Sequence, residues 1–264
     1  MFSSVLVTAL AGFLFQSAPS AGIDTAAPQS DSSGLRSPDQ PTAAPSNAKQ
    51  LPPEQLGDIF MARKRYREAL EQYQRCDQKS AVIANKIGIA YHQLLDLSNA
   101  AKQYKLATRL NKHYSEAFNN LGTVYYSEKS YRRAIHLYKT SLRLSPNSAT
   151  VYMNLGSAYF SIHRDKDALE AYTKAMDLDP DVLQHTSANG ILLQEHTVED
   201  KARFHFYMAK LCAQKGLNDQ ALQFVRKSIE EGFKDRQKFR GPEFAALKGN
   251  PEFEELMKKE PREL

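Results

Sequence analysis

A repeat of 34 residues is the feature that most constrains what this chain can fold into. Three glycines, Gly88, Gly122 and Gly156, lie 34 residues apart, and a tyrosine follows each of them after three residues. The segments around these glycines align without a gap. A fixed period of this length indicates repeated supersecondary units, each of which buries its apolar face only against its neighbours.

The second half of each repeat is periodic as well. A small residue is followed four residues later by a tyrosine in the pairs Ala100 and Tyr104, Ala134 and Tyr138, and Ala168 and Tyr172. In the first half, apolar residues recur at steps of three and four, which predicts one helical face. We therefore expect two helices per repeat, with Gly122 allowing a close approach of the second helix and Pro146 ending it.

This pattern resembles the tetratricopeptide repeat, a helix-turn-helix unit of 34 residues. Residues 115–182 match it in two full units, and residues 81–114 lack only the closing proline. Weaker units surround Leu56-Gly57 and Met208-Ala209. The resemblance, which is to bacterial and exported members of the family, implies an all-α fold. We expect a right-handed solenoid of about five hairpins that ends in a C-terminal helical cap.

The organisation along the chain follows from where the repeat is regular. Residues 51–182 are expected to hold units 1 to 4, and residues 183–200, where the period breaks, an inserted loop or helix. Residues 201–264 are expected to hold a degenerate unit and the cap. In that cap, near-copies beginning at Pro242 and Pro251 each predict a short helix, because proline fits a first helical turn. Their Phe and Leu residues would cover the end of the stack.

The N-terminus predicts export. Residues 5–15 form an apolar run of signal-peptide length, and small residues follow it. We expect a signal peptide over residues 1–21 and a disordered Ala/Pro/Ser-rich linker over residues 22–50. No Lys or Arg precedes the apolar run, so the alternatives are an apolar helix that stays attached and a wrongly chosen start of the sequence. The expected localisation is periplasmic or secreted, with no stable membrane span after removal of the signal.

The sequence offers little chemistry. The formal net charge of +5 argues against a protein built around a strongly basic nucleic-acid surface, but it leaves a local basic patch open. Glu195-His196 is the one acid and histidine neighbour pair, and no histidine or cysteine stands at metal-ligand spacing. Cys76 and Cys212 lie in distant units, too far apart for a disulfide. We therefore expect no metal, no cofactor, no nucleic acid and no catalytic activity.

The resemblance also implies where a partner binds. First helices of successive units in this family line a concave groove that holds a peptide or a partner helix. The corresponding positions here are Asn85, Ile89, His92, Asn119, Thr123, Tyr126, Met153, Ser157 and Phe160. Their amide, hydroxyl and aromatic groups suit an extended peptide. Ile89 and Thr123 stand where the chaperone-binding members carry Asn, which makes a C-terminal carboxylate an unsuitable ligand.

These observations favour a protein-interaction scaffold that binds a protein or peptide segment. Two other interpretations of the same surface remain open. The groove could be filled by the protein's own tether or by a neighbouring subunit. Separately, the chain could be a structural assembly subunit that uses its outer faces within a cell-envelope or secretion complex, or a regulatory domain for a separately encoded enzyme.

Overall fold

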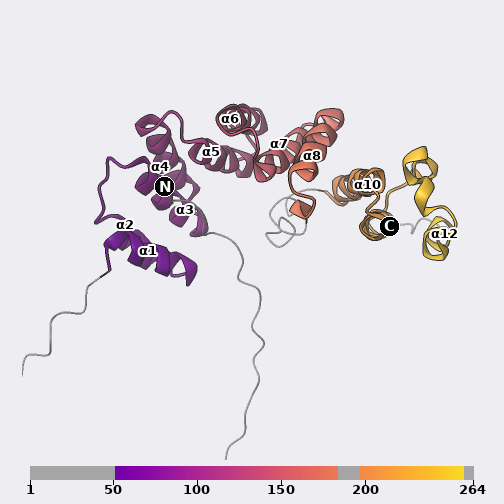
Figure 1. Cartoon of the computed structure of the whole chain (residues 1–264), viewed down its shortest axis with the longest axis horizontal. Helices are drawn as coiled ribbons and strands as arrows, with labels where there is room; N and C mark the ends of the chain where they lie inside the picture. The colour runs from indigo at the N-terminus through magenta and orange to yellow at the C-terminus, as the bar shows by residue number, and fades with distance from the viewer. Residues whose placement is uncertain (1–50, 184–196, 259–264) are drawn as a thin grey trace, which may run out of the picture. The chain divides into compact units, whose positions relative to one another are not determined.

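The computed structural model describes residues 51–183 and 197–258, all of which belong to one compact unit (Figure 1). The described residues form helices and turns and contain no β-strand. This confirms the predicted all-α solenoid. The expected signal peptide and linker, residues 1–50, lie outside the described residues, as do residues 184–196 of the expected insert and the last six residues of the chain.

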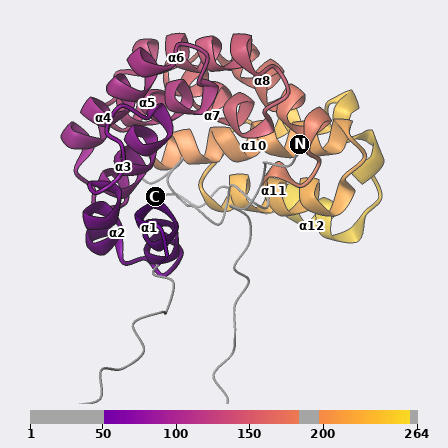
Figure 2. The same ribbon diagram turned by 60° about the vertical axis from the view of Figure 1, so that its left-hand side comes forward.

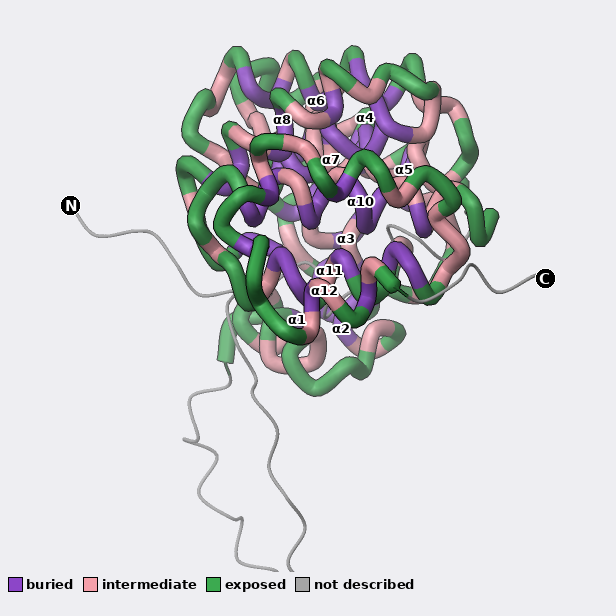
Figure 3. Tube along the Cα trace, turned by 90° about the vertical axis from the view of Figure 1, so that its right-hand side faces the viewer, coloured by how far each residue is buried: buried purple, intermediate pink, exposed green. Residues whose placement is uncertain are grey.

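Ten of the described helices pair into five hairpins. The first helices of the hairpins are α1 (Pro53–Ala62), α3 (Ala81–Gln93), α5 (Ser115–Ser127), α7 (Ala149–Ser161) and α10 (Val198–Gln214). The second helices are α2 (Tyr66–Tyr73), α4 (Leu97–Leu110), α6 (Tyr131–Leu144), α8 (Asp165–Leu178) and α11 (Asn218–Glu230). Figure 2 shows α4, α6 and α8 following one another on one side of the row, with α3, α5 and α7 on the other. Along each helix, buried and exposed residues alternate at helical spacing (Figure 3).

A glycine and a tyrosine join the two helices of each of the first four hairpins. The glycine of the first helix and the tyrosine of the second keep one fixed spacing, in the pairs Gly57 and Tyr73, Gly88 and Tyr104, Gly122 and Tyr138, and Gly156 and Tyr172. A Cβ atom placed on any of these glycines would lie 2.7 Å or less from a ring carbon of its tyrosine. All four rings are buried. The predicted close approach at Gly122 is therefore confirmed, and the absence of a side chain makes room for the ring.

The turn inside each hairpin contains one residue in the left-handed conformation. It is Lys64, Leu95, Lys129 or His163 in the first four hairpins, with φ between 58° and 61°, and Gly216 in the fifth, with φ of 74°. The amide of the residue that follows donates to a carbonyl in the last turn of the first helix, as from Ser130 to Tyr125 at 2.8 Å. This bond satisfies a helix-end carbonyl and reverses the chain.

The fifth hairpin solves the same packing problem with different residues. Ala209 stands in the position of the glycine and Val225 in the position of the tyrosine, at the same spacing as in the other hairpins. Both are completely buried. The extra methyl group of alanine is thus matched by a smaller partner, and the space between α10 and α11 stays filled.

The fifth hairpin also joins the row in a different direction. Arg203, near the start of α10, contacts Asp165 at the start of α8, and Lys215, after the end of α10, contacts Asp177 near the end of α8. α10 therefore runs in the same direction as α8. In the regular part of the row, the direction of a first helix repeats from unit to unit, because Asn85 bonds Asn120 and Asn119 bonds Asn154 at the same separation of 35 residues.

This reversal gives the insert a physical reason. A first helix that started beside the end of α8 would need only a short turn. A first helix that starts beside Asp165 needs a connection as long as α8, about 21 Å for its 14 residues. The chain between Leu183 and Thr197, residues 184–196, is long enough to cover that distance.

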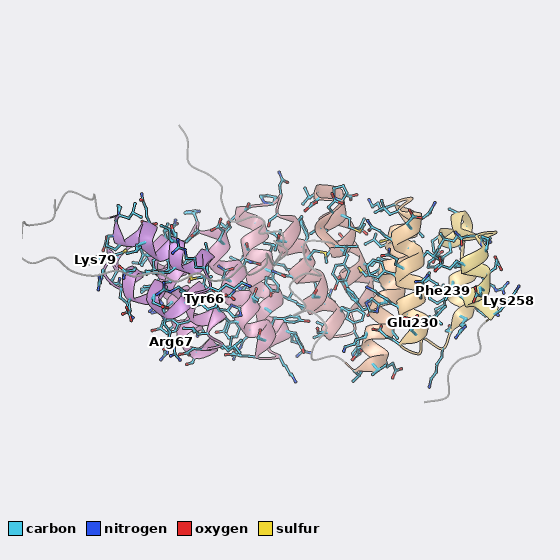
Figure 4. The ribbon with its side chains drawn as sticks, turned by 90° about the horizontal axis from the view of Figure 1, so that it is seen from below. Tyr66, Arg67, Lys79, Glu230, Phe239 and Lys258 are labelled. Atoms are coloured by element: carbon cyan, nitrogen blue, oxygen red, sulfur yellow. The ribbon has the colours of Figure 1, made fainter. Side chains whose placement is uncertain are left out.

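The C-terminal end of the row is covered by aromatic side chains. η1 (Arg236–Arg240) and η2 (Pro242–Leu247) are 3₁₀ helices, and α12 (Pro251–Lys258) is an α-helix. Their buried residues are Phe239, Phe244, Leu247, Phe253 and Leu256. Figure 4 places Phe239 and Lys258 at this end, and Tyr66 and Arg67 at the other. Both prolines begin helices as expected, although the one at Pro242 is of the tighter 3₁₀ type.

Candidate functional site

The candidate site is the face formed by the nine predicted positions on α3, α5 and α7, which we call the first-helix face. The structure places three of these positions on each helix. α3 contacts α5, and α5 contacts α7. The nine side chains are therefore brought into one row of adjacent helices, as the repeat spacing predicts.

Asparagine side chains link the three helices. The Nδ2 of Asn120 donates to the Oδ1 of Asn85 at 3.0 Å, and the Nδ2 of Asn154 donates to the Oδ1 of Asn119 at 2.9 Å. Asn119 and Asn120 are joined at 3.3 Å, which completes a ladder of amides from α3 to α7. Asn85 is only 3% exposed. Part of the amide capacity predicted for a ligand thus fixes the helices against each other.

The ladder has a charged counterpart at the start of the row. The Nζ of Lys86, which occupies the position of Asn120 in the preceding unit, lies 2.7 Å from an oxygen of Glu54 and 2.8 Å from one of Asp58. These contacts raise the pKa of Lys86 against the opposing effect of burial. An ion pair therefore connects α1 with α3 where amides connect the later helices.

Two predicted hydroxyl groups serve the hairpins themselves. Tyr138 donates from its Oη to the Oγ1 of Thr123 at 3.4 Å, and Tyr172 donates to the Oγ of Ser157 at 3.1 Å. Burial raises the pKa of both tyrosines well above its usual value. Ile89 occupies the corresponding position of α3 and offers no acceptor for Tyr104. These hydroxyls thus satisfy buried phenols.

The structure corrects the prediction at α7. Met153, Ser157 and Phe160 are 1%, 3% and 2% exposed, so their side chains belong to the core. The ring of Phe160 meets the rings of Phe204 and Tyr207 edge-on at 5.7 and 6.4 Å. The guanidinium of Arg203 lies over it at 4.4 Å. The reversed α10 therefore covers this end of the first-helix face.

Sequence reasoning missed the residues of α10 that cover Phe160. Arg203 bridges the turn after α7, the start of α8 and its own helix: it lies 2.8 Å from the Nδ1 of His163, 3.4 Å from Asp165 and 3.0 Å from Asp200. Tyr207 donates to Asp165 at 3.0 Å. The sequence does carry one sign that the face ends at α7. Asn85 and Asn119 lie three residues before their repeat glycines, and Met153 stands at that position in the next unit, where the ladder stops.

The accessible part of the first-helix face lies on α3 and α5. Ile89, His92, Asn119, Thr123 and Tyr126 are half-buried there. Burial lowers the pKa of His92, so its imidazole is neutral near pH 7. Tyr126 shares a hydrogen bond of 3.1 Å with Ser161 and meets the ring of Tyr131 edge-on at 5.2 Å. The face thus combines an aliphatic, an imidazole, an amide, a hydroxyl and a phenol.

The described residues hold no group of three or more His, Cys, Asp or Glu side chains that could bind a metal ion. Glu195-His196, the one candidate pair from the sequence, lies outside them. Cys76 and Cys212 are free thiols, the first half-buried and the second buried. Desolvation raises the pKa of Cys212 to about 12. Across residues 51–183 and 197–258, no helix combines the length and the apolar character needed to cross a bilayer.

The family comparison matches residues 113–181, which include α5 to α8, to the family described as tetratricopeptide repeat. The match covers the two units in which the repeat pattern is most complete. No curated protein matches the sequence significantly.

Several solved structures resemble this helical solenoid. MamA from Desulfovibrio magneticus RS-1 is 20% identical, with 69% of this chain and 94% of that chain covered and a TM-score of 0.48. YrrB, described as having an unusual peptide-binding site, is 16% identical, with coverage of 72% and 90% and a TM-score of 0.46. The first repeat domain of Spaghetti (RPAP3), solved with an HSP90 peptide, is 22% identical, with coverage of 42% and 90% and a TM-score of 0.41.

Proposed function

We propose that this tetratricopeptide repeat protein is a non-catalytic scaffold that binds an extended segment of a partner protein on the first-helix face of α3 and α5. The observation that carries the proposal is the asparagine ladder. It holds Ile89, His92 and Tyr126 on helices that are fixed before a ligand arrives. A surface that is already ordered loses less entropy when it captures a flexible segment.

The chemistry of the accessible face supports a segment with both apolar and polar groups. Ile89 and Tyr126 provide apolar contact area, and Asn119 keeps one of its two amide protons, which suits a peptide carbonyl, because the other is donated to Asn120. The side chains that face a ligand here carry no cation, because burial keeps His92 neutral near pH 7. The face therefore suits an internal segment of the partner better than a C-terminal carboxylate.

The test uses the full chain to capture a partner, followed by titration of the bound segment. Tyr126→Ala is expected to weaken binding about tenfold or more, as loss of an aromatic anchor does. Gln93→Ala is the second variant, because Gln93 is exposed beside His92 and its removal does not disturb the core. Tyr152→Ala is the matched control, since Tyr152 is a half-buried tyrosine of α7 outside the nine positions.

The proposal is overturned if Tyr126→Ala and Gln93→Ala both remain folded and bind the segment as tightly as the unchanged chain. Helical content and melting temperature establish that each variant is folded. An assembly that survives both substitutions would favour the structural-subunit alternative.

We also propose that the chain acts outside the cytoplasm. The support is the apolar run of residues 5–15 followed by small residues, which is typical of a cleaved export signal. N-terminal sequencing of the protein recovered from cell fractions tests this proposal. Cleavage near residue 21 would support export, and an intact cytoplasmic chain would contradict it.

A further inference from the structure

The positive charge of this chain is concentrated in its middle. Residues 97–164 contain ten Lys and Arg but only two acidic residues, Glu116 and Glu128, which gives this segment a formal charge of +8. The whole chain carries +5, so the remaining residues carry a net negative charge. The small net charge of the chain is therefore the sum of a strongly basic middle segment and a remainder that is acidic overall.

The structure places most of these cations on two second helices. α4 and α6 contain no Asp or Glu. Their exposed basic side chains, which we call the basic face, are Lys102, Lys105, Arg109, Arg132, Arg133, His136, Lys139 and Arg143. α4 and α6 belong to consecutive units and follow one another on the side of the row away from α3, α5 and α7 (Figure 2).

The basic face lacks internal counter-charges. Within the described residues, no Lys or Arg of the basic face forms a salt bridge. Several cations elsewhere do form ion pairs, as Lys86 with Glu54, Arg164 with Asp167, and Lys210 with Glu243. Unscreened like charges repel one another, so an anionic partner would relieve this repulsion.

Tyrosine rings connect the cations of neighbouring helices. The ring of Tyr125 has the Nζ of Lys105 from α4 at 5.5 Å and the guanidinium of Arg133 from α6 at 5.7 Å. The ring of Tyr159 likewise has Lys139 at 5.5 Å and Arg164 at 4.8 Å. The basic face is therefore continuous from one unit to the next, and these contacts restrict its long side chains.

A hollow of about 370 Å³ lies on α6, lined by His136, Lys139, Leu142 and Arg143. Three basic side chains surround a single aliphatic one. A carboxylate can pair with Lys139 and Arg143 while an adjacent apolar side chain packs against Leu142. The hollow thus suits an acidic side chain next to an apolar one.

We propose that the basic face is a second docking surface that takes an acidic segment of a partner protein. A nucleic-acid single strand fits less well, because Tyr125 and Tyr159 already interact with cations of this chain and are not free for bases to stack on. A lipid surface also fits less well. Leu110 is the only large apolar side chain exposed on the described α4 and α6, and it lies at the end of α4.

The probe for this proposal is a fluorescent 12-residue peptide of Glu, Asp and two Leu residues, with a Gln and Asn version as the neutral control. Binding to the full chain is followed by anisotropy at about 0.15 M salt, where exposed charges are partly screened. The acidic peptide is expected to bind, and its affinity is expected to fall as the salt concentration rises. The neutral peptide is expected not to bind.

Lys139→Glu/Arg143→Glu is expected to weaken binding of the acidic peptide at least tenfold. The matched control is Lys234→Glu/Lys248→Glu, which makes the same change in net charge at exposed lysines outside the basic face. This control is expected to change the affinity less than threefold. Equal weakening by both variants would overturn the proposal, because attraction would then depend only on total charge.

Two further probes distinguish the class of partner. They are vesicles with about 30% phosphatidylserine and a duplex DNA of 12 base pairs. The assignment to an acidic protein segment would be overturned if the vesicles or the DNA bound more tightly than the peptide and Lys139→Glu/Arg143→Glu abolished that binding. Tyr126→Ala is expected to leave the acidic peptide unaffected, which separates this surface from the first-helix face.

Discussion

The first four hairpins and the fifth hairpin solve the same packing problem in two ways. The first four place glycine against tyrosine, as Gly122 against Tyr138, and the fifth places Ala209 against Val225. Both combinations fill the space between two helices. The comparison shows that the repeat keeps two residues of matching size across the hairpin and not the same two residues.

The two regions differ more in how hairpins join than in how hairpins fold. Between α3, α5 and α7 the asparagine ladder fixes one direction, and the first-helix face continues from unit to unit. At α10 the direction reverses and Phe160 becomes buried. A recognisable repeat therefore predicts a hairpin, but the contacts between hairpins decide whether a binding surface continues through it.

The largest effects are expected when Gly122 and Tyr138 in the third hairpin are replaced, one at a time and together, by the Ala and Val combination of the fifth. Tyr138→Val is expected to destabilise the chain by about 3 kcal/mol, because it leaves a cavity beside Gly122. Gly122→Ala is expected to cost about 1–3 kcal/mol, because its methyl group would lie 2.7 Å from the ring of Tyr138. The double variant should recover part of both losses. Urea unfolding of the four proteins measures the free energies.

The double-mutant cycle is expected to give a coupling energy above about 1 kcal/mol, the sign of residues in direct contact. Gly122→Ala paired with Val225→Ala, a distant residue of the fifth hairpin, is the control and should be additive. Additivity between Gly122 and Tyr138 would break the comparison, because the two hairpins would then not be equivalent solutions.

The next expected effect concerns the reversed joint. Arg203→Ala removes contacts to Asp165 and Asp200 and the cation over Phe160, and is expected to cost about 1–2 kcal/mol. Hydrogen exchange should show the loss mainly in α10 and α11. Arg226→Ala, which removes an exposed pair with Glu252 inside the C-terminal region, is the control. Equal loss of protection in α5 and α6 would show that the joint is not a separate boundary.

A smaller effect is expected at the turns. Leu95 is 83% exposed and has a φ of 61°, whereas Gly216 occupies the same turn position in the fifth hairpin. The left-handed conformation strains leucine, and Leu95→Gly removes this strain. Glycine loses more conformational entropy on folding, which offsets part of the gain. The variant is therefore expected to stabilise the chain by a net of about 0.5 kcal/mol. Leu95→Ala, which keeps a Cβ, should give no such gain. A lower melting temperature for Leu95→Gly would contradict this reason.

The sequence predicted what depends on neighbouring residues. The spacing of Gly88, Gly122 and Gly156 set the hairpins, because a missing side chain on one helix and a ring on the next helix are parts of one local unit. The direction of α10 could not be predicted. It depends on Arg203 meeting Asp165 across an insert, and no local pattern encodes such a contact.

The binding surface could be predicted from the sequence only in part, as the fold could. Positions on α3 and α5 follow from the repeat, but the burial of Phe160 follows from the reversed helix. The basic face was visible in the sequence, because residues 97–164 contain only two acidic side chains. The net charge of the whole chain does not reveal it, because the acidic residues elsewhere in the chain offset part of it.

The smallest expected effect compares one buried histidine from each region. Burial lowers the pKa of His92 in α3, and burial also lowers that of His205 in α10, where Glu231 acts in the opposite direction. A histidine with a lowered pKa binds fewer protons in the folded state than in the unfolded state. Its contribution to stability is therefore complete above the unfolded pKa of about 6.5 and decreases as the pH falls from there through the folded values.

Urea unfolding between pH 7.5 and about 5 measures this dependence in His92→Gln, in His205→Gln and in the unchanged chain. Each variant should flatten the dependence relative to the unchanged chain. His92→Gln should flatten it more than His205→Gln, because no carboxylate offsets the burial of His92. The reverse order would show that Glu231 does not offset the burial of His205, and would contradict this difference between the two regions.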